Sequence, residues 1–208
     1  MTAESIIFDM DGTLWDSSQS VADSWNEVIS ELPDVDITVT RKDIQGIMGL
    51  TMDVIADRFF GNTSKKRRME IMEACGDHEN GYLLKHGGIL YENAEKTLSA
   101  LSGKHRLFIV SNCQKGYIEA FLEYYDLGRL FDGHICWGDN SYSKGDNIKY
   151  IMTKYSITDG VYVGDTQGDC DSAYYAGAKF IHAAYGFGTA DRADAVIHRF
   201  DELVTVLD

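Results

Sequence analysis

Short runs of apolar residues recur along the chain, and each run ends abruptly in polar residues. The clearest are Ile6–Phe8, Leu107–Val110 and Val161–Val163. Each is too short for a buried helix and has no polar position, a pattern typical of a central strand that is covered on both faces. Less regular or shorter runs predict further strands at His134–Trp137, Phe180–Ile181 and Val196–Ile197.

Helical spacing of apolar residues fills most of the chain between these runs. From Asn93 onward, segments with helical periodicity alternate with the expected strands. Such alternation favours a parallel sheet with helices on both faces. The sequence therefore predicts an α/β protein with a doubly wound, Rossmann-like parallel sheet.

The stretch from Trp15 to about Leu84 departs from this alternation, because it shows helical periodicity and no convincing strand. Thr40, Thr51 and Ser64 stand where helix N-caps are expected. We interpret residues 16–87 as a helical cap inserted after the first strand, and residues 1–15 and 88–208 as the core domain. Gly87–Gly88 is the expected return hinge.

Polar residues follow the expected strands where each one ends, and chemistry in open α/β sheets gathers beyond these carboxyl ends. The candidates are Asp9, Asp11, Ser111, Asn112, Lys144, Asp165 and Asp169. Several acids around one point repel each other unless a hard cation lies among them, and Mg²⁺ fits such a ligand set. Asp9 could then attack phosphorus while Asp11 donates and accepts a proton. Ser111, the Asn112 backbone N–H and Lys144, which is expected in a polar loop, would hold the phosphate oxygens.

Charge and composition narrow the choice of partner. The formal net charge of −14 argues against nucleic acid or an anionic membrane as the main partner, while a local cation still permits a phosphorylated substrate. The apolar runs are too short to span a membrane, and the four cysteines are widely spaced, as expected for buried thiols in a reducing cytosol. We expect a cytoplasmic protein that acts on a small phosphorylated metabolite, as a monomer or a homodimer.

Four segments together resemble the motifs of the haloacid dehalogenase (HAD) superfamily, in their order and spacing. They are Asp9-x-Asp11-Gly-Thr13-Leu, Ser111-Asn112, Lys144 and Gly164-Asp165-x-x-x-Asp169. The stretch from Val163 to Gly177 is especially similar to phosphoglycolate phosphatase-like members, whose helical caps the insertion also resembles. The resemblance covers essentially the whole chain.

This resemblance implies a Mg²⁺-dependent phosphatase that forms an aspartyl phosphate on Asp9. Asp11 would protonate the leaving oxygen, then activate water, and would ligate the metal through its backbone carbonyl. Thr13 would restrain the loop or touch the phosphate, which Ser111 and Lys144 would bind. The implied metal ligands are Asp9, Asp11, Asp165 and Asp169, the last bound directly or through water.

Two departures from the family pattern bear on the function. Family members of this type usually follow the motif-three lysine with proline, whereas Gly145 follows Lys144 here, and Lys149 is the fallback. Mutases that resemble β-phosphoglucomutase carry an arginine in the substrate loop of the cap, where this chain has Met52. We therefore favour a phosphatase for phosphoglycolate or a sugar phosphate over a phosphotransferase. A catalytically weak binding or regulatory module is the second alternative, which the intact set of catalytic candidates disfavours.

Some other residues invite a functional interpretation. The basic run Lys65–Arg68 is interpreted as a solvated helix face, because charge blocks usually face water. Arg41 and Lys42 are candidates for substrate recognition from the cap. Trp25 is expected to pack in the core, near the cleft between the cap and the core.

Overall fold

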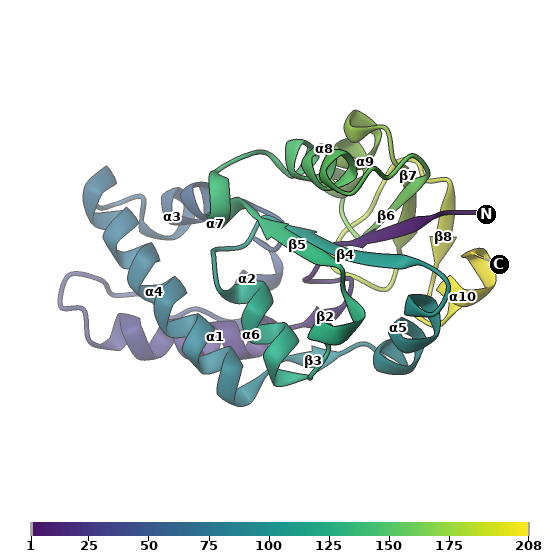
Figure 1. Ribbon diagram of the computed structural model, residues 1–208. Coiled ribbons are helices and arrows are strands. Elements are labelled where there is room, and N and C mark those ends of the chain that lie inside the picture. Colours follow the sequence, from purple (N-terminus) through teal and green to yellow (C-terminus); the bar gives the residue numbers. More distant parts are fainter. Residues whose placement is uncertain (1, 208) are drawn as a thin grey trace.

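The computed structural model describes residues 2–207 and is built on a six-stranded sheet (Figure 1). The strand order is β5-β4-β1-β6-β7-β8, and all neighbours run parallel. The strands are β1 (Ser5–Phe8), β4 (Arg106–Ser111), β5 (Gly133–Cys136), β6 (Gly160–Gly164), β7 (Lys179–Ala183) and β8 (Ala195–Ile197). The predicted doubly wound parallel α/β fold is confirmed.

The central strands are buried because helices cover both faces of the sheet. Side chains alternate along β1, so that Ile6 and Phe8 pack into one apolar cluster and Ile7 into another. The Ile7 face is covered by α8 (Lys144–Lys154) and α9 (Gln167–Ala176). The helices that cover the other face are α5 (Ala94–Ser102), α6 (Tyr117–Tyr124) and α10 (Glu202–Leu207). A 3₁₀ turn (Gly128–Leu130) and the short α7 (Trp137–Asn140) flank β5.

Four helices lie between β1 and β4 in the sequence, and we call them the helical block. They are α1 (Ser18–Ser30), α2 (Arg41–Gln45), α3 (Met52–Phe60) and α4 (Lys65–His86). Thr40 and Ser64 cap α2 and α4, since their hydroxyls accept backbone N–H bonds from the third helical residue. Thr51 precedes α3 as expected, but its side chain makes no capping bond. Figure 1 shows the block to one side of the sheet, with α1 and α4 packed against each other.

A two-stranded antiparallel ribbon joins the helical block to the sheet. Its strands are β2 (Trp15–Asp16) and β3 (Ile89–Leu90). The sequence pattern predicts no strand at Trp15–Asp16, because two residues are too few to show a period. Gly87 has a φ of 64°, and a side chain there would collide with the ring of Tyr124. The strand that leads into the helical block, β2, thus pairs with the strand that leads out of it, β3, where the hinge is expected.

Lys144, expected in a loop, is instead the first residue of α8. The Ser143 hydroxyl accepts the backbone N–H of Asp146 and donates to its carboxylate at 2.6 Å, so this pair sets the start of the helix. The strand expected at His134–Trp137 also ends one residue early, because Trp137 begins α7.

Candidate active site

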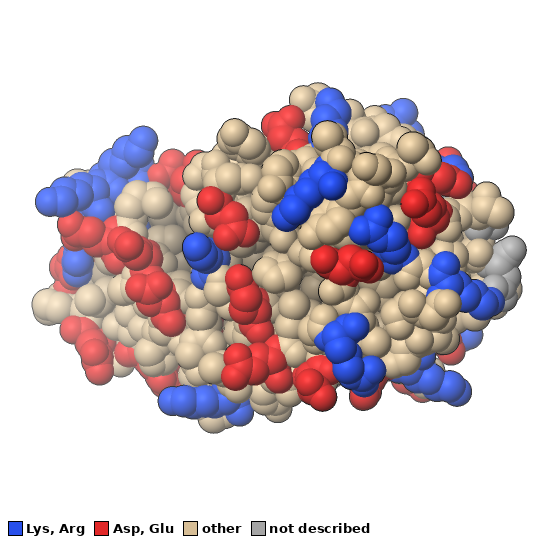
Figure 2. Space-filling view, viewed as in Figure 1, with Lys and Arg blue, Asp and Glu red and all other residues tan. Residues whose placement is uncertain are grey.

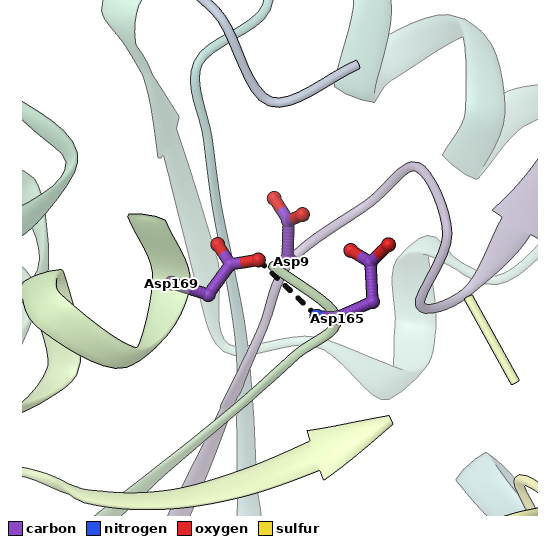
Figure 3. A group of neighbouring side chains, drawn as sticks. All are labelled: Asp9, Asp165 and Asp169. Atoms are coloured by element: carbon purple, nitrogen blue, oxygen red, sulfur yellow. Dashed lines mark hydrogen bonds between the residues drawn. The ribbon is translucent and has the colours of Figure 1, made fainter. Parts of the chain in front are cut away.

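Three carboxylates meet beyond the carboxyl ends of two neighbouring strands (Figure 3). Asp9 follows β1, Asp165 follows β6, and Asp169 lies in the first turn of α9. One oxygen from each lies within 4.8 Å of the others, and all three residues are buried. The strand order reverses here, since the chain runs from β1 to β4 on one side and returns to β6 on the other. Ligands bind at such switch points in open α/β sheets.

The Lys144 ammonium is buried between two of these acids. Its Nζ atom lies 2.9 Å from Asp9 Oδ1 and 2.6 Å from Asp169 Oδ1. Burial alone would lower the pKa of Lys144, but the charges of Asp169 and Asp9 outweigh it and raise the pKa, so the side chain stays charged. Lys149, the fallback, lies over the ring of Tyr175 at 3.6 Å from its centroid.

The Asp9 carboxyl group has a pKa well above its ordinary value. Burial is the largest cause, and the nearby charge of Asp169 adds to it, while Lys144 opposes both. A buried acid close to two other acids is unstable as a full anion without compensating positive charge. Lys144 supplies part of this charge.

Asp169 is held by its own helix. Its Oδ2 accepts the backbone N–H groups of Asp165 at 3.2 Å and Thr166 at 2.9 Å, and the Thr166 hydroxyl at 2.7 Å. Thr166 in turn accepts the Asp169 N–H, which completes a capping box. Since Lys144 occupies Oδ1, both carboxylate oxygens of Asp169 already have protein partners.

Asp165 differs, because one of its oxygens lacks a partner. The backbone N–H groups of Phe187 and Gly188 donate to Oδ2 at 2.7 and 3.2 Å, whereas the buried Oδ1 has no hydrogen-bond partner within residues 2–207. Burial, followed by the charge of Asp169, raises the pKa of Asp165 to about 7. An unsatisfied buried carboxylate oxygen is costly unless something else binds it. The acidic cluster of Asp9, Asp165 and Asp169, all oxygen donors, can therefore hold a hard metal ion.

Two glycines give Asp165 its space. Gly12 has a φ of +82°, and a Cβ atom there would lie 2.3 Å from Asp165 Oδ2. A Cβ atom on Gly186 would lie 2.3 Å from the Cβ of Asp165. Gly186, Phe187 and Gly188 were not among the predicted site residues, and their signal in the sequence is the pair of glycines soon after β7.

Asp11 does not belong to the three-acid cluster, and its carboxylate accepts hydrogen bonds from two hydroxyl groups. Its Oδ1 accepts hydrogen bonds from Ser17 Oγ at 2.7 Å and from Tyr117 Oη at 2.6 Å. Burial raises the pKa of Asp11 to about 6, although these two hydrogen bonds oppose the rise. A carboxyl group with this pKa can both give and take a proton near neutral pH. Ser17 and Tyr117 were not among the predicted site residues.

The predicted phosphate-binding residues occupy different surroundings. Ser111, the last residue of β4, and Asn112 line the cavity that also contains Asp9 and Asp11. The Asn112 amide donates to the Gly49 carbonyl at 2.8 Å and so ties the sheet to the helical block. Thr13 does not line this cavity. It is fully buried, and its carbonyl accepts the Tyr185 hydroxyl at 2.8 Å, as suits a residue that restrains the loop.

The cavity lies between the helical block and the sheet and has an empty volume of about 480 Å³. This volume includes space that is open to solvent. Trp25 from α1 and Met52 from α3 line it together with several other apolar side chains. None of the described residues that line it is a lysine, arginine or histidine.

A buried acid, Glu79, enters this cavity from α4. Its Oε1 accepts the Gln114 amide at 3.0 Å, and its Oε2 accepts the indole N–H of Trp25. Burial raises the pKa of Glu79 to about 7, against the effect of these two hydrogen bonds. Glu79 was not among the predicted site residues, and its only signal in the sequence is an acid in register with the core positions Met72 and Cys75 of the same helix.

The remaining sequence candidates lie elsewhere. Arg41 pairs with Asp16 of the ribbon at 2.5 Å and does not line the cavity, and Lys42 is exposed. In the run Lys65–Arg68, Lys65 and Lys66 are exposed as predicted, whereas Arg67 pairs with Asp34 and Arg68 with Asp57. Figure 2 shows acidic and basic side chains interspersed over the face in view.

Comparison with known proteins identifies the class of this fold and site. The model of the haloacid dehalogenase-like hydrolase family matches residues 6–183, so the chain belongs to this family. The family match and the phosphatases among the relatives together identify the chain as a phosphatase-type enzyme. No helix in the described part of the chain has the length and apolar character needed to cross a membrane.

Individual relatives match along nearly the whole chain. The chain is 28% identical to a phosphoglycolate phosphatase of Aquifex aeolicus, covering 98% of this chain and 96% of that protein. A haloacid dehalogenase-like hydrolase from Bacteroides fragilis has a TM-score of 0.83 at 22% identity, over 97% of this chain and 100% of that one. CbbY from Rhodobacter sphaeroides, solved in complex with phosphate, has a TM-score of 0.81 at 19% identity, over 97% and 96%. These two structural matches show a shared fold.

Proposed function

We propose that this chain is a Mg²⁺-dependent phosphatase that hydrolyses a small phosphate monoester through an aspartyl phosphate on Asp9. One observation carries the proposal: Asp9 is fixed by Lys144 inside the acidic cluster, and it lines the same cavity as Asp11. Asp9 thus belongs both to the candidate cation site and to the cavity that contains the proposed acid–base group. The phosphatase relatives support the same reaction.

In the first step, an Asp9 carboxylate oxygen attacks phosphorus, and the bond from phosphorus to the leaving oxygen breaks. Asp11 gives its proton to that oxygen, so that a neutral alcohol leaves. The pKa of Asp11, about 6, suits this transfer near neutral pH. Lys144 holds Oδ1 of Asp9, and Ser111 and the Asn112 backbone N–H are proposed to hold the phosphoryl oxygens.

In the second step, the Asp11 carboxylate takes a proton from a water molecule. The water oxygen attacks phosphorus, the bond between phosphorus and Asp9 breaks, and inorganic phosphate leaves. Ser17 and Tyr117 hold Asp11 in position through both steps, since they donate to Oδ1. The other carboxylate oxygen stays free for the proton.

The unpartnered Oδ1 of Asp165 supports a role for this acid as a direct metal ligand, together with Asp9. The backbone carbonyl of Asp11 is proposed as a further ligand. Both oxygens of Asp169 already have protein partners, which favours contact through a water molecule. When bound, Mg²⁺ would neutralise charge on the phosphate and on the acids around it.

We further propose that the helical block is a cap, residues 16–87, on a core of residues 1–15 and 88–208. The β2–β3 ribbon would be its hinge, and the Asn112–Gly49 hydrogen bond a contact of the closed state. A closed cap excludes bulk water during the first step and limits the enzyme to small substrates. This favours a small metabolite over a phosphorylated macromolecule.

Hydrolysis is favoured over phosphomutase activity by the charge of the cavity. A mutase must hold a second phosphate beneath the cap, and a dianion needs cationic partners there. Met52 is apolar, and none of the described residues that line the cavity carries positive charge. The cavity therefore suits a substrate with one phosphate group.

The test is release of inorganic phosphate from p-nitrophenyl phosphate, with Mg²⁺ and with a chelator. We expect Mg²⁺-dependent hydrolysis that Asp9→Asn abolishes and that Asp171→Asn, an exposed acid on α9, leaves unchanged. Hydrolysis that persists in Asp9→Asn would overturn the proposed nucleophile. Metal-independent hydrolysis would overturn the proposed cofactor.

A further inference from the structure

Beyond the acidic cluster, the cavity contains a carboxyl group that the reaction does not use. Glu79 lies on α4 in the helical block and is 3% exposed. Each of its oxygens accepts one hydrogen bond, from Gln114 or from Trp25. A carboxylate can accept about four such bonds, so Glu79 can still accept from a ligand in the cavity.

Asn112 provides a second acceptor without a donor. Its Nδ2 donates to the Gly49 carbonyl, which fixes the orientation of the amide. Its Oδ1 is buried and has no hydrogen-bond partner in the part of the chain that the structure describes. A buried acceptor of this kind is expected to meet a donor when the cavity is filled.

The other lining groups offer no cationic partner to a negative charge on the alcohol side of a substrate. Most of the wall is apolar, with Val21, Ile47 and Ile55 among its residues, and the described lining contains no lysine, arginine or histidine. A substrate carboxylate would lose its water and face Glu79 with no cation from the cavity wall. Juxtaposed like charges in such a setting strongly disfavour binding.

We propose that Glu79 determines specificity: the enzyme takes a phosphate monoester whose leaving alcohol carries a hydrogen-bond donor, an ammonium or a hydroxyl group, and rejects one that carries a carboxylate. This rests on the proposed function, because it assigns the alcohol side of that substrate. Glu79 and Asn112 Oδ1 accept from the donor group, and the apolar wall contacts the carbon chain. Phosphoglycolate, whose leaving alcohol carries a carboxylate, is therefore no longer the expected substrate.

The test uses four phosphate monoesters of nearly the same size: 2-aminoethyl phosphate, 2-hydroxyethyl phosphate, propyl phosphate and phosphoglycolate. With Mg²⁺ at pH 8, we expect kcat/KM for the better of the two donor-bearing esters to exceed that for phosphoglycolate at least about tenfold, with propyl phosphate between them. The ester that ranks first tells an ammonium from a hydroxyl substrate. Phosphoglycolate or propyl phosphate in first place would overturn the proposal.

The variant Glu79→Gln keeps the size of the side chain and removes its charge. We expect the preference for 2-aminoethyl phosphate over phosphoglycolate to fall about tenfold or more. Glu73→Gln, an exposed position on the same helix, should keep the wild-type preference. An unchanged preference in Glu79→Gln would contradict the assignment. If that variant does not fold, the order of the four esters with the wild-type enzyme decides.

These measurements distinguish a failure of the proposed Glu79 specificity from a failure of the proposed phosphatase activity. Asp9-dependent hydrolysis of p-nitrophenyl phosphate combined with the wrong order of the four esters overturns the role of Glu79 alone. No Asp9-dependent hydrolysis of any of these esters overturns the proposed function itself.

Discussion

The hydroxyl group of Tyr117 donates a hydrogen bond of 2.6 Å to Oδ1 of Asp11, across 106 positions of the sequence. Ser17 donates to the same oxygen, and its hydroxyl lies 2.7 Å from that of Tyr117. The proposed acid–base group is thus held from two sides, by the helix that follows β4 and by the segment that enters the helical block. Its position depends on both parts of the molecule.

Replacing Tyr117 with phenylalanine removes one of the two donors and keeps the ring. We expect kcat to fall roughly tenfold with little change in KM, because a less firmly held Asp11 transfers its proton less efficiently while binding persists. Steady-state kinetics with p-nitrophenyl phosphate measures both constants. Tyr124→Phe, an exposed tyrosine on the same helix, is the matched control and should behave as wild type. A rise in KM with kcat unchanged would argue that Tyr117 acts in binding instead.

Asp165→Asn tests the metal site by stability as well as by activity. An asparagine can keep its oxygen toward the N–H groups of Phe187 and Gly188, which directs an NH₂ group to the place of the unpartnered Oδ1. We expect Mg²⁺ at 100 times its Kd to stabilise the wild type by about 2.7 kcal/mol and to leave the variant nearly unaffected. Thermal unfolding with and without Mg²⁺ measures the difference.

In the absence of metal, Asp165→Asn should be at least as stable as the wild type, because it removes one charge from a buried cluster of like charges. Asp171→Asn on the exposed face of α9 should leave the Mg²⁺ effect intact. Equal stabilisation of wild type and Asp165→Asn by Mg²⁺ would place the ion elsewhere.

Lys144→Met tests whether the buried ammonium holds the acids together. Without it, Asp9 and Asp169 face each other with no compensating charge, and removal of one partner from a buried ion pair costs about 3–5 kcal/mol. Denaturant unfolding in the presence of a chelator measures the loss. Lys149→Met on the same helix should cost less than about 1 kcal/mol, since the interactions it loses with Tyr175 and Asp146 are exposed to solvent. A similar, small cost for both variants would show that Lys144 is dispensable for the cluster.

The sequence was sufficient to predict the sheet and the acids around it, because these signals are local. Asp9 stands directly after one apolar run and Asp165 one glycine beyond another, and neighbouring parallel strands bring their ends together. The start of α8 at Lys144 was missed because the cap at Ser143 was read as part of a polar loop. This error concerned a boundary and left the residue in the site.

No sequence pattern predicts the groups that position and surround Asp11. Ser17 and Tyr117 are 100 residues apart, and Glu79 and Gln114 are 35 apart. Each pair meets only after the helical block docks on the sheet, and hydroxyl or amide residues at such separations carry no periodic signal. Glu79 breaks the rule that core positions are apolar, a kind of violation that is expected at functional sites.

The last prediction concerns the pH dependence of stability that Glu79 introduces. Burial, with a contribution from the charge of Asp11, raises the pKa of Glu79 from its ordinary value of 4.5 to about 7 in the folded protein. The folded state therefore binds this proton more tightly than the unfolded state, so its stabilising effect is complete below pH 4.5 and is lost as the pH rises through about 7. Glu79→Gln carries no such proton. Relative to wild type, its free energy of unfolding should rise by up to roughly 3 kcal/mol across this window.

Urea unfolding of both proteins at a series of pH values between these limits measures this difference, in a chelator so that metal binding does not contribute. Comparison with the variant cancels the titration of Asp9, Asp11 and Asp165, which is common to both proteins when their pKa values are unchanged. Glu73→Gln should run parallel to wild type, because its side chain is exposed on the same helix. A difference between Glu79→Gln and wild type that stays constant with pH would mean that Glu79 is ionised throughout. The carboxylate would then face the cavity as a permanent charge, and a substrate ammonium group would be favoured over a hydroxyl.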